Sequence, residues 1–175
     1  MQFVDLDTDS ETLLRALAKD ERLVPYGGAN FGMPLALIEP TTDRLVPNDR
    51  FFVRSNGPVP VIDPRTWRLR ISGHVEQDMS LSLDELLDFA LRRCEAFLEC
   101  AGNGRTRFDP LPPGTPWRND AIGNALWEGV SLADLLAAVG ILPGAVDLVT
   151  RGGDFAEMRR GLPLAVALDL SLIHI

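Results

Sequence analysis

The interpretation of this chain is decided by the stretch Phe97-Leu98-Glu99-Cys100-Ala101-Gly102-Asn103-Gly104-Arg105. An apolar run over residues 96–98 is typical of a strand, and it delivers Cys100 to a point where two glycines let the backbone turn sharply. A neighbouring cation, Arg105 or Arg107, favours the thiolate form, which ligates metals or attacks electrophiles. The pattern therefore predicts a thiol at the lip of a pocket.

Packing alone also explains a cysteine at this position. Cysteine is among the most buried residue types, and a single cysteine is a signal of low specificity. A disulfide with Cys94 is disfavoured by spacing: in an extended chain, six residues at about 3.3 Å each separate the two cysteines by about 20 Å. The local pattern thus leaves a reactive thiol and a buried one as alternatives.

Two further stretches change this balance. They are Asn48-Asp49-Arg50-Phe51-Phe52-Val53-Arg54-Ser55-Asn56-Gly57-Pro58-Val59-Pro60 and Trp117-Arg118-Asn119-Asp120-Ala121-Ile122-Gly123-Asn124-Ala125-Leu126-Trp127-Glu128-Gly129-Val130. Together with Cys100-Ala101-Gly102-Asn103-Gly104-Arg105 they resemble, in order, segments of the sulfite oxidase family of molybdenum enzymes. The resemblance covers about residues 24–169, and Ser55-Asn56 stand where many members carry Asn-His.

The resemblance implies an α+β fold, the sulfite oxidase-type molybdopterin-binding domain, with mixed sheets and short helices, incomplete at its carboxyl end. We expect residues 1–23 to form a helical lead-in and residues 24–170 to form the partial domain. Residues 171–175 do not resemble the family's continuation. We interpret this tail as the mark of a truncated gene or of a sequence-assembly artefact.

The resemblance also implies a molybdenum atom held by a dithiolene pterin (molybdopterin) and by the Cys100 thiolate. Arg54 and Arg105 would face an anionic substrate, and Trp117 would form a wall of its pocket. The residues implied to bind the cofactor are Phe52, Val53, Arg54, Ser55, Asn56, Cys100 and Asp154. Judged by local pattern alone, 51–54 is an ordinary edge strand with a solvated arginine, and Asp154 follows two glycines in an ordinary turn.

Two positions depart from the family pattern. Asn56 keeps a hydrogen-bond donor where many members have histidine, but it cannot titrate. Met158 stands where animal sulfite oxidases carry a substrate-site tyrosine, and Tyr26, the chain's only tyrosine, lies far away in sequence. We therefore expect no substitute for that phenol, which weakens sulfite as the substrate more than it weakens the molybdenum interpretation.

The implied activity is oxygen-atom transfer on a small, sulfite-like oxyanion. Electrons would pass to a separate cytochrome-like haem protein, because this chain contains no haem motif, and the parent protein would be a homodimer. Two alternatives stay open: a reductase of an S- or N-oxide on the same cofactor, and a non-catalytic fragment. A nicotinamide enzyme is set aside, because Gly102-Asn103-Gly104 lacks the third glycine of the dinucleotide fingerprint.

Composition excludes several other classes of protein. A net charge of −8 argues against nucleic acid as a partner, since phosphate binding needs an electropositive face. No apolar run approaches the length of about 18 residues that a membrane span needs. The acidic amino terminus lacks a secretory-signal pattern, so we expect a cytoplasmic protein, with a periplasmic one as the alternative.

Local signals predict the regular elements. Helices are expected over 9–19, with Thr8-x-x-Glu11 as a capping box, over 83–91 after Ser82, and over 132–139 between Ser131 and Gly140. Arg92 and Arg93 would follow the second helix, at the end that favours cations. Strands are expected over 51–54, 67–71, 96–98 and 147–150, and another helix begins within 161–164.

Overall fold

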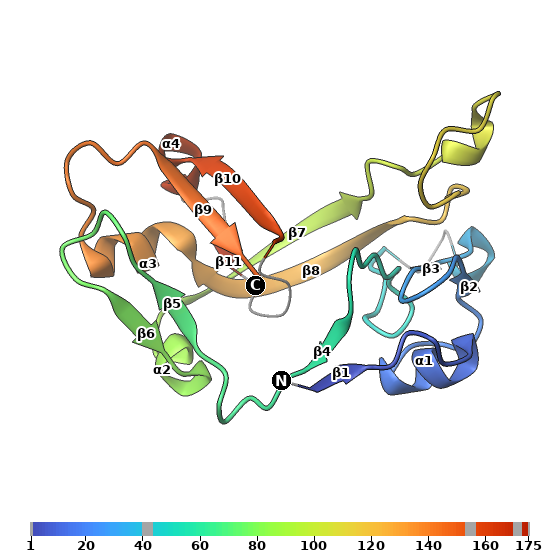
Figure 1. The fold of residues 1–175 in the computed structure, drawn as a ribbon, viewed down its shortest axis with the longest axis horizontal. Helices are drawn as coiled ribbons and strands as arrows, with labels where there is room; N and C mark the ends of the chain where they lie inside the picture. Colours follow the sequence, from blue (N-terminus) through green and yellow to red (C-terminus); the bar gives the residue numbers. More distant parts are fainter. Residues whose placement is uncertain (1, 40–43, 153–156, 170–172, 175) are drawn as a thin grey trace. The chain divides into compact units, whose positions relative to one another are not determined.

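The computed structural model describes residues 2–39, 44–152, 157–169 and 173–174 (Figure 1). The chain divides into two compact units, Met1–Val61 with Glu95–Leu126, and Ile62–Cys94 with Trp127–Ile175. Two strands, β7 (Leu91–Glu99) and β8 (Ile122–Ser131), contribute residues to both units. They are neighbours in a three-stranded sheet of order β11-β8-β7, in which β11 (Ile173–His174) pairs antiparallel with β8.

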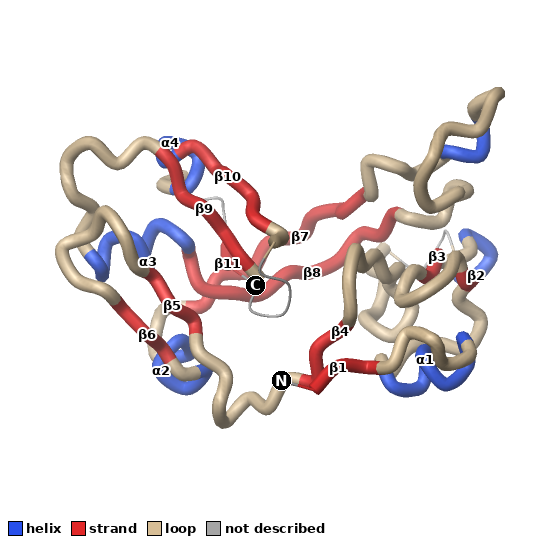
Figure 2. Tube along the Cα trace, in the orientation of Figure 1, coloured by secondary structure: helices blue, strands red, loops and turns tan. Residues whose placement is uncertain are grey.

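The first unit consists of short elements joined by long loops (Figure 2). Proline density explains the scarcity of regular structure over residues 20–50, because proline fixes φ and lacks an N–H. Two antiparallel pairs are present: β1 (Gln2–Val4) with β4 (Val59–Val61), and β2 (Val24–Pro25) with β3 (Phe31–Gly32). The helical elements are α1 (Ser10–Ala16) and the 3-10 turns η1 (Leu35–Leu37) and η2 (Arg105–Arg107).

The core of the first unit is built largely from aromatic and aliphatic side chains of its loops. At least nine-tenths of the surface of each of these residues is buried, which keeps the irregular backbone in place through packing. The largest are Phe31, Met33, Phe51, Phe52 and Trp117, and α1 adds Leu13 and Leu14.

The second unit contains most of the helix and sheet. Strand β5 (Leu69–Ile71) pairs antiparallel with β6 (Met79–Leu81), and β9 (Asp147–Arg151) pairs antiparallel with β10 (Arg159–Pro163). The helices are α2 (Leu83–Leu87), α3 (Leu132–Val139) and α4 (Leu164–Ala167). A buried cluster of Leu86, Val130 and Leu135 forms its core, with Trp67, Leu69, Ile71, Leu81 and Phe89 packed against it.

Several predicted elements are confirmed. Helix α3 begins and ends as expected, and Gly140 follows it with a φ of 66°, in the left-handed region. The capping box of α2 is complete: Ser82 accepts from the Glu85 backbone N–H, and the Glu85 carboxylate accepts from the Ser82 backbone N–H. Strand β5 occupies the last three residues of the stretch 67–71, where alternation predicted a strand, and β9 begins where the strand over 147–150 was expected.

The helix predicted over 83–91 is wrong in its second half. Helix α2 ends at Leu87, and strand β7 begins at Leu91. Arg92 and Arg93 therefore belong to a strand and do not follow a helix; they pair with Asp134 and Glu128, respectively. Strand β7 is the neighbour of β8 in the three-stranded sheet, and this long-range pairing outweighed the local helical pattern.

Two predicted helix caps also differ. Helix α1 is capped by Asp9, whose carboxylate accepts from the Thr12 backbone N–H at 3.0 Å, and not by Thr8. Ser131 is the N-cap residue of α3, but its hydroxyl makes no cap hydrogen bond. Among the described residues, no helix has the length and apolar character needed to cross a membrane.

Candidate active site

Cys100 is the first residue after β7, and its thiol is free and partly buried. Its backbone N–H donates to the Ala121 carbonyl at 2.9 Å, and its own carbonyl accepts from the Asn103 N–H at 2.8 Å. The chain then turns at Gly104, whose φ of 75° lies in the left-handed region that favours glycine. The sharp turn predicted after the cysteine is confirmed.

Gly102 is needed for space. A Cβ at this position would lie 2.7 Å from a guanidinium nitrogen of Arg105 and 3.1 Å from Cδ1 of Trp117. A Cβ at Gly114 would also collide with the Arg105 guanidinium. The Arg105 side chain therefore fills the room that two glycines leave, next to the edge of the Trp117 ring.

Hydrogen bonds join residues 100–106, the thiol loop, to residues 117–121, the tryptophan segment. Because they involve both ends of the loop, the position of the Cys100 thiol follows that of the tryptophan segment. Besides the Cys100 bond, they run from Gly104 N–H to Arg118 O (2.5 Å), from Thr106 N–H to Trp117 O (3.1 Å) and from Ala121 N–H to Asn103 Oδ1 (3.0 Å).

Trp117 is a core residue of the first unit, with 1% of its surface exposed. Its ring centroid lies 4.7 Å from that of Tyr26 and 6.4 Å from that of Phe52, in tilted and edge-on arrangements. Such offset aromatic contacts add to the stabilisation from burial. The aromatic cluster thus holds the tryptophan segment at its first residue.

Partly buried Tyr26 and buried Asp120 form a hydrogen-bonded pair that the sequence interpretation missed. The Tyr26 hydroxyl donates to Asp120 Oδ2 at 2.6 Å, and burial together with this carboxylate raises the pKa of Tyr26 to about 12. Asp120 is 5% exposed, and its Oδ1 has no partner among the described residues. Tyr26, expected to be remote, is therefore part of the structure behind the thiol loop. The available signal was an acidic residue two positions before a strand with buried residues, because a buried carboxylate needs a hydrogen-bond donor.

Arg54 is exposed and is held by neutral acceptors. Its guanidinium donates to Asn30 Oδ1 at 3.1 Å, and also to the Ser55 carbonyl and to Asn56 Oδ1. Asn30 Oδ1 accepts in addition from the Ser55 N–H at 3.1 Å, so it joins both residues. No carboxylate in the described part of the chain pairs with Arg54, which leaves its charge available to an anion. Sequence reasoning missed Asn30, because it lies 24 residues from Arg54.

The strand predicted over 51–54 is reduced to a single bridge, in which Val53 pairs with Phe31. The Phe51 N–H is already used in a turn, donating to the Pro47 carbonyl at 3.0 Å. Phe52 is 7% exposed and lies against Phe51, with ring centroids 5.2 Å apart. Its side chain is therefore part of the core.

Asp154 lies outside the described residues. Within the part of the chain that the structure describes, no three His, Cys, Asp or Glu side chains gather into a metal-binding cluster. Cys100, the metal ligand predicted from the sequence, therefore belongs to no cluster of three such side chains among the described residues.

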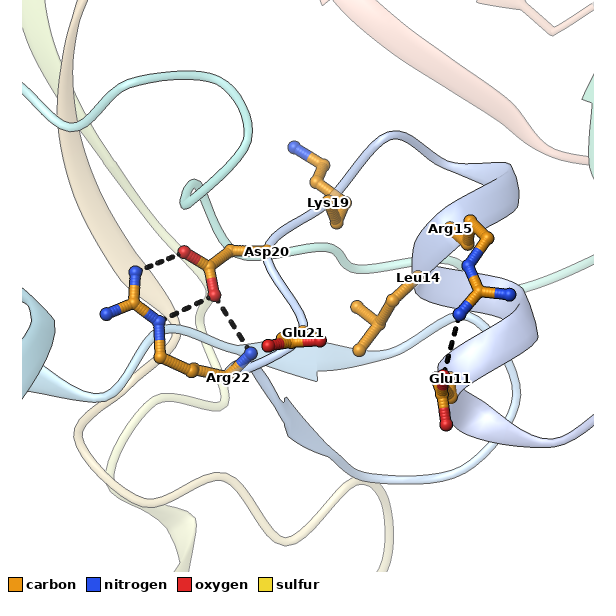
Figure 3. A pocket seen from close by; sticks show the side chains of 7 residues that line it. All are labelled: Glu11, Leu14, Arg15, Lys19, Asp20, Glu21 and Arg22. Atoms are coloured by element: carbon orange, nitrogen blue, oxygen red, sulfur yellow. Dashed lines mark hydrogen bonds and ion pairs between the residues drawn. The ribbon is translucent and has the colours of Figure 1, made fainter.

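A pocket of about 570 Å³ lies beside α1, away in sequence from all the predicted site residues (Figure 3). Its charged groups largely satisfy one another: Arg15 pairs with Glu11 at 2.7 Å, and Arg22 with Asp20 at 2.5 Å. The hydrogen bonds from Arg22 lower the pKa of Asp20 to about 2. These ion pairs account for the charged side chains around the pocket without a bound ligand.

Comparison with known proteins assigns the fold. The family model of the oxidoreductase molybdopterin-binding domain matches residues 56–174. The chain belongs to this family. The sulfane dehydrogenase SoxCD of Paracoccus pantotrophus matches 96% of the chain with a TM-score of 0.70 and 25% identity. The predicted α+β, sulfite oxidase-type fold is confirmed, whereas the domain boundary at residue 24 stays a prediction.

Curated relatives agree with this family. Sulfite oxidase of Gallus gallus is 42% identical over 55% of this chain, and that of Arabidopsis thaliana is 32% identical over 73%. The chain spans 22% and 35% of the lengths of these enzymes, and 39% of the SoxCD chain. This molybdopterin-binding domain is thus of the sulfite oxidase type, an oxidoreductase family whose cofactor is molybdenum bound to molybdopterin.

Proposed function

We propose that this domain takes part in oxygen-atom transfer on a small, sulfite-like oxyanion, with the Cys100 thiolate as the protein ligand of molybdenum. Electrons released by the substrate pass to a separate haem protein. Arg54 and Arg105 receive the anion beside Trp117. The residues proposed to hold the pterin are Phe52, Val53, Arg54, Ser55, Asn56 and Asp154.

The donor set supports the ligand role of Cys100. One soft thiolate on a turn, with no protein cluster around it in the described residues, suits a metal that brings its other ligands from a cofactor. The thiol is only partly buried, so a metal has access to it. This observation carries the proposal.

The arginines support an anionic substrate. Arg54 donates to three neutral acceptors and Arg105 to the Pro113 carbonyl, so neither guanidinium is neutralised by a carboxylate among the described residues. Each keeps a full positive charge in a chain with a net charge of −8. Planar guanidinium groups suit bidentate recognition of oxyanions.

The bound cofactor supplies the oxygen-atom and two-electron chemistry: the substrate gains an oxygen derived from water, and two electrons and two protons are released. The chain's own residues supply placement and charge. The thiol loop presents Cys100, and the Arg54 guanidinium, oriented by Asn30 and Asn56, attracts the anion and offsets its desolvation. Gly102 leaves the room in which Arg105 lies beside Trp117.

The test of the ligand role is the molybdenum and pterin content of the chain, purified from a host that makes the cofactor. Cys94→Ser is the matched control, because both cysteines are free and partly buried. We expect wild type and Cys94→Ser to retain molybdenum and Cys100→Ser to lose it. Equal molybdenum in Cys100→Ser and wild type would refute the ligand role, and a folded wild-type chain without metal or pterin would refute cofactor binding by this chain.

A second test addresses the anion site. In the protein loaded with cofactor, Arg54→Gln should raise the KM for sulfite by about tenfold, because it removes a hydrogen bond from a charged group to the anion. Arg65→Gln is the control, because exposed Arg65 already pairs with Asp63 at 2.9 Å. An unchanged KM in Arg54→Gln would remove Arg54 from the substrate site.

A reductase on the same cofactor is the second candidate. Nitrate reductase [NADH] of Spinacia oleracea is 31% identical over 63% of this chain. The discriminating measurement compares sulfite-dependent reduction of a cytochrome with nitrate-dependent oxidation of a reduced dye. Turnover in the second assay alone would replace the oxidase proposal by the reductase one.

A further inference from the structure

Hydrogen bonds link three parts of the first unit in series: the thiol loop, the tryptophan segment and residues 26–33. The thiol loop is hydrogen-bonded to the tryptophan segment, and the tryptophan segment is held in turn by residues 26–33. The Met33 N–H donates to the Asp120 carbonyl at 2.7 Å, and the Asp120 carboxylate lies against Gly32, where a Cβ would come within 2.5 Å of Cγ.

Tyr26 contacts the tryptophan segment along most of its length. Its ring packs against Trp117, its hydroxyl donates to Asp120, and its phenol oxygen accepts from the Arg118 N–H at 3.4 Å. Loss of this one side chain would therefore loosen the tryptophan segment at its start and near its end, where Phe52 and the Met33 N–H would be left to hold it. The segment and the thiol loop share their hydrogen bonds, so the release would reach Cys100.

The hydrogen bond to Asp120 is a strong one. It joins a hydroxyl to a buried carboxylate at 2.6 Å, and among the described residues the other carboxylate oxygen has no partner, so this bond carries most of the compensation for burial. Because the pKa of Tyr26 is raised to about 12, the phenol stays a donor throughout the neutral range.

We propose that Tyr26 and Asp120 are positioning residues that hold the tryptophan segment, and through it the Cys100 thiol, in the geometry that receives the metal. They touch neither substrate nor metal in this role. The inference rests on the proposed function only for what Cys100 binds; the placement of the thiol is a property of the metal-free chain.

The experiment measures alkylation of Cys100 by iodoacetamide as a function of pH, in metal-free full-length chain carrying Cys94→Ser. The variants are Tyr26→Phe, which keeps the ring against Trp117 but loses the donor, Asp120→Asn, which keeps an acceptor oxygen, and their combination. Cys100 is partly buried, so release of the thiol loop exposes its thiol further, and we expect Tyr26→Phe to raise the alkylation rate by up to about tenfold, the effect of losing one hydrogen bond to a charged group. Asp120→Asn should have a smaller effect, and the double variant should fall short of the product of the two effects.

The control separates positioning from general loss of stability. Leu14→Ala shortens a buried side chain of α1 that is 4% exposed. Its free energy of unfolding in urea is measured beside that of Tyr26→Phe, so that the alkylation rates are compared at known stability. Faster alkylation in Tyr26→Phe than in the control supports the proposal. Equal rates in the two variants, or a Tyr26→Phe rate within twofold of wild type, would overturn it. If Tyr26→Phe fails to fold, the comparison of Asp120→Asn with the control decides in the same way.

This outcome is independent of the molybdenum measurement. A chain that binds no metal still reports thiol placement, and a chain that loads molybdenum can still alkylate at the wild-type rate in Tyr26→Phe. Where the wild type does load, the content of Tyr26→Phe is a second readout: the proposal expects it to fall below that of Leu14→Ala.

Discussion

The hydroxyl of Tyr26 donates a 2.6 Å hydrogen bond to the carboxylate of Asp120, 94 residues further along the chain. This bond ties the chain's only tyrosine to the segment that hydrogen-bonds the thiol loop. It also gives one oxygen of the Asp120 carboxylate a hydrogen-bond donor, in a residue that is only 5% exposed. Stability of the first unit and placement of Cys100 are therefore coupled through two residues that do no chemistry.

The first prediction concerns the titration of Tyr26. The phenolate absorbance of the chain reports this residue alone, and its midpoint should lie at about 12, because burial and the Asp120 carboxylate oppose ionisation. Since folding raises the pKa above the ordinary tyrosine value of about 10, the associated stability is fully present below about pH 10 and is lost as pH rises toward 12. Asp120→Asn should shift the midpoint down toward 10. A wild-type midpoint at the ordinary tyrosine value of about 10 would contradict the partial burial of Tyr26 and its hydrogen bond to Asp120.

The second prediction concerns Gly32. An alanine Cβ there would lie 2.5 Å from Cγ of Asp120 and 3.0 Å from its Oδ1, so the carboxylate must move away from Tyr26. Gly32→Ala should lower the free energy of unfolding by about 1–3 kcal/mol in urea titrations. Gly161→Ala is the control, because no atom lies within 4 Å of the added Cβ, and its effect should stay within about 0.5 kcal/mol. Equal effects would show that the carboxylate is not confined as described.

The third prediction compares Ser82 and Ser131, the residues at the N-cap positions of α2 and α3. Ser82→Ala removes a complete capping box from α2 and should cost about 1 kcal/mol. Ser131 is fully buried, and its hydroxyl has no partner among the described residues, so Ser131→Ala should be neutral or stabilising by up to about 1 kcal/mol. Thermal unfolding should show a lower Tm for Ser82→Ala and an unchanged or higher Tm for Ser131→Ala. A clear loss of stability in Ser131→Ala would reveal a hydrogen bond that the described residues do not contain.

The fourth prediction concerns Asn103 in the thiol loop. Its amide nitrogen donates to Glu99 Oε1 at 2.9 Å, and its Oδ1 accepts from the Ala121 N–H at 3.0 Å. Asn103→Asp keeps the acceptor but sets a second carboxylate against Glu99, and should cost about 1 kcal/mol at neutral pH. The close carboxylates would have raised pKa values in the folded variant, so the cost should shrink as pH falls through about 4–5. Urea unfolding against pH measures this, and Glu99→Gln in the same chain should restore stability; a pH-independent cost would exclude charge repulsion.

Local signals predicted much of the second unit. The capping box at Ser82 and Glu85, the glycine after Val139 and the alternation in β5 each involve residues within about four positions of one another. The same holds for the turn after Cys100, which needs only the glycine at 104. Three ordered motifs, read together, also identified the family.

Tertiary structure decided what local pattern could not. Helix α2 stops at Leu87 because the residues from Leu91 onward are extended in β7, whose arginines pair with Asp134 and Glu128. The strand predicted at 51–54 shrinks to one bridge because Pro47 takes the Phe51 N–H. In the first case, pairing with the distant strand β8 outweighs local helix propensity, which is worth only a few tenths of a kcal/mol per residue. In the second case, a turn closed within four residues withdraws a backbone N–H from the predicted strand.

The candidate site divides in the same way. By itself, the sequence determined the thiol, its turn and the presence of Arg54 and Arg105, because these are carried by contiguous motifs. Only the folded chain decided that Asn30 orients Arg54 and that Tyr26 and Asp120 stand behind Trp117. The physical reason is that a buried carboxylate and an uncompensated guanidinium require hydrogen-bond partners, while no short-range pattern specifies which distant segment packing brings within about 3 Å of them.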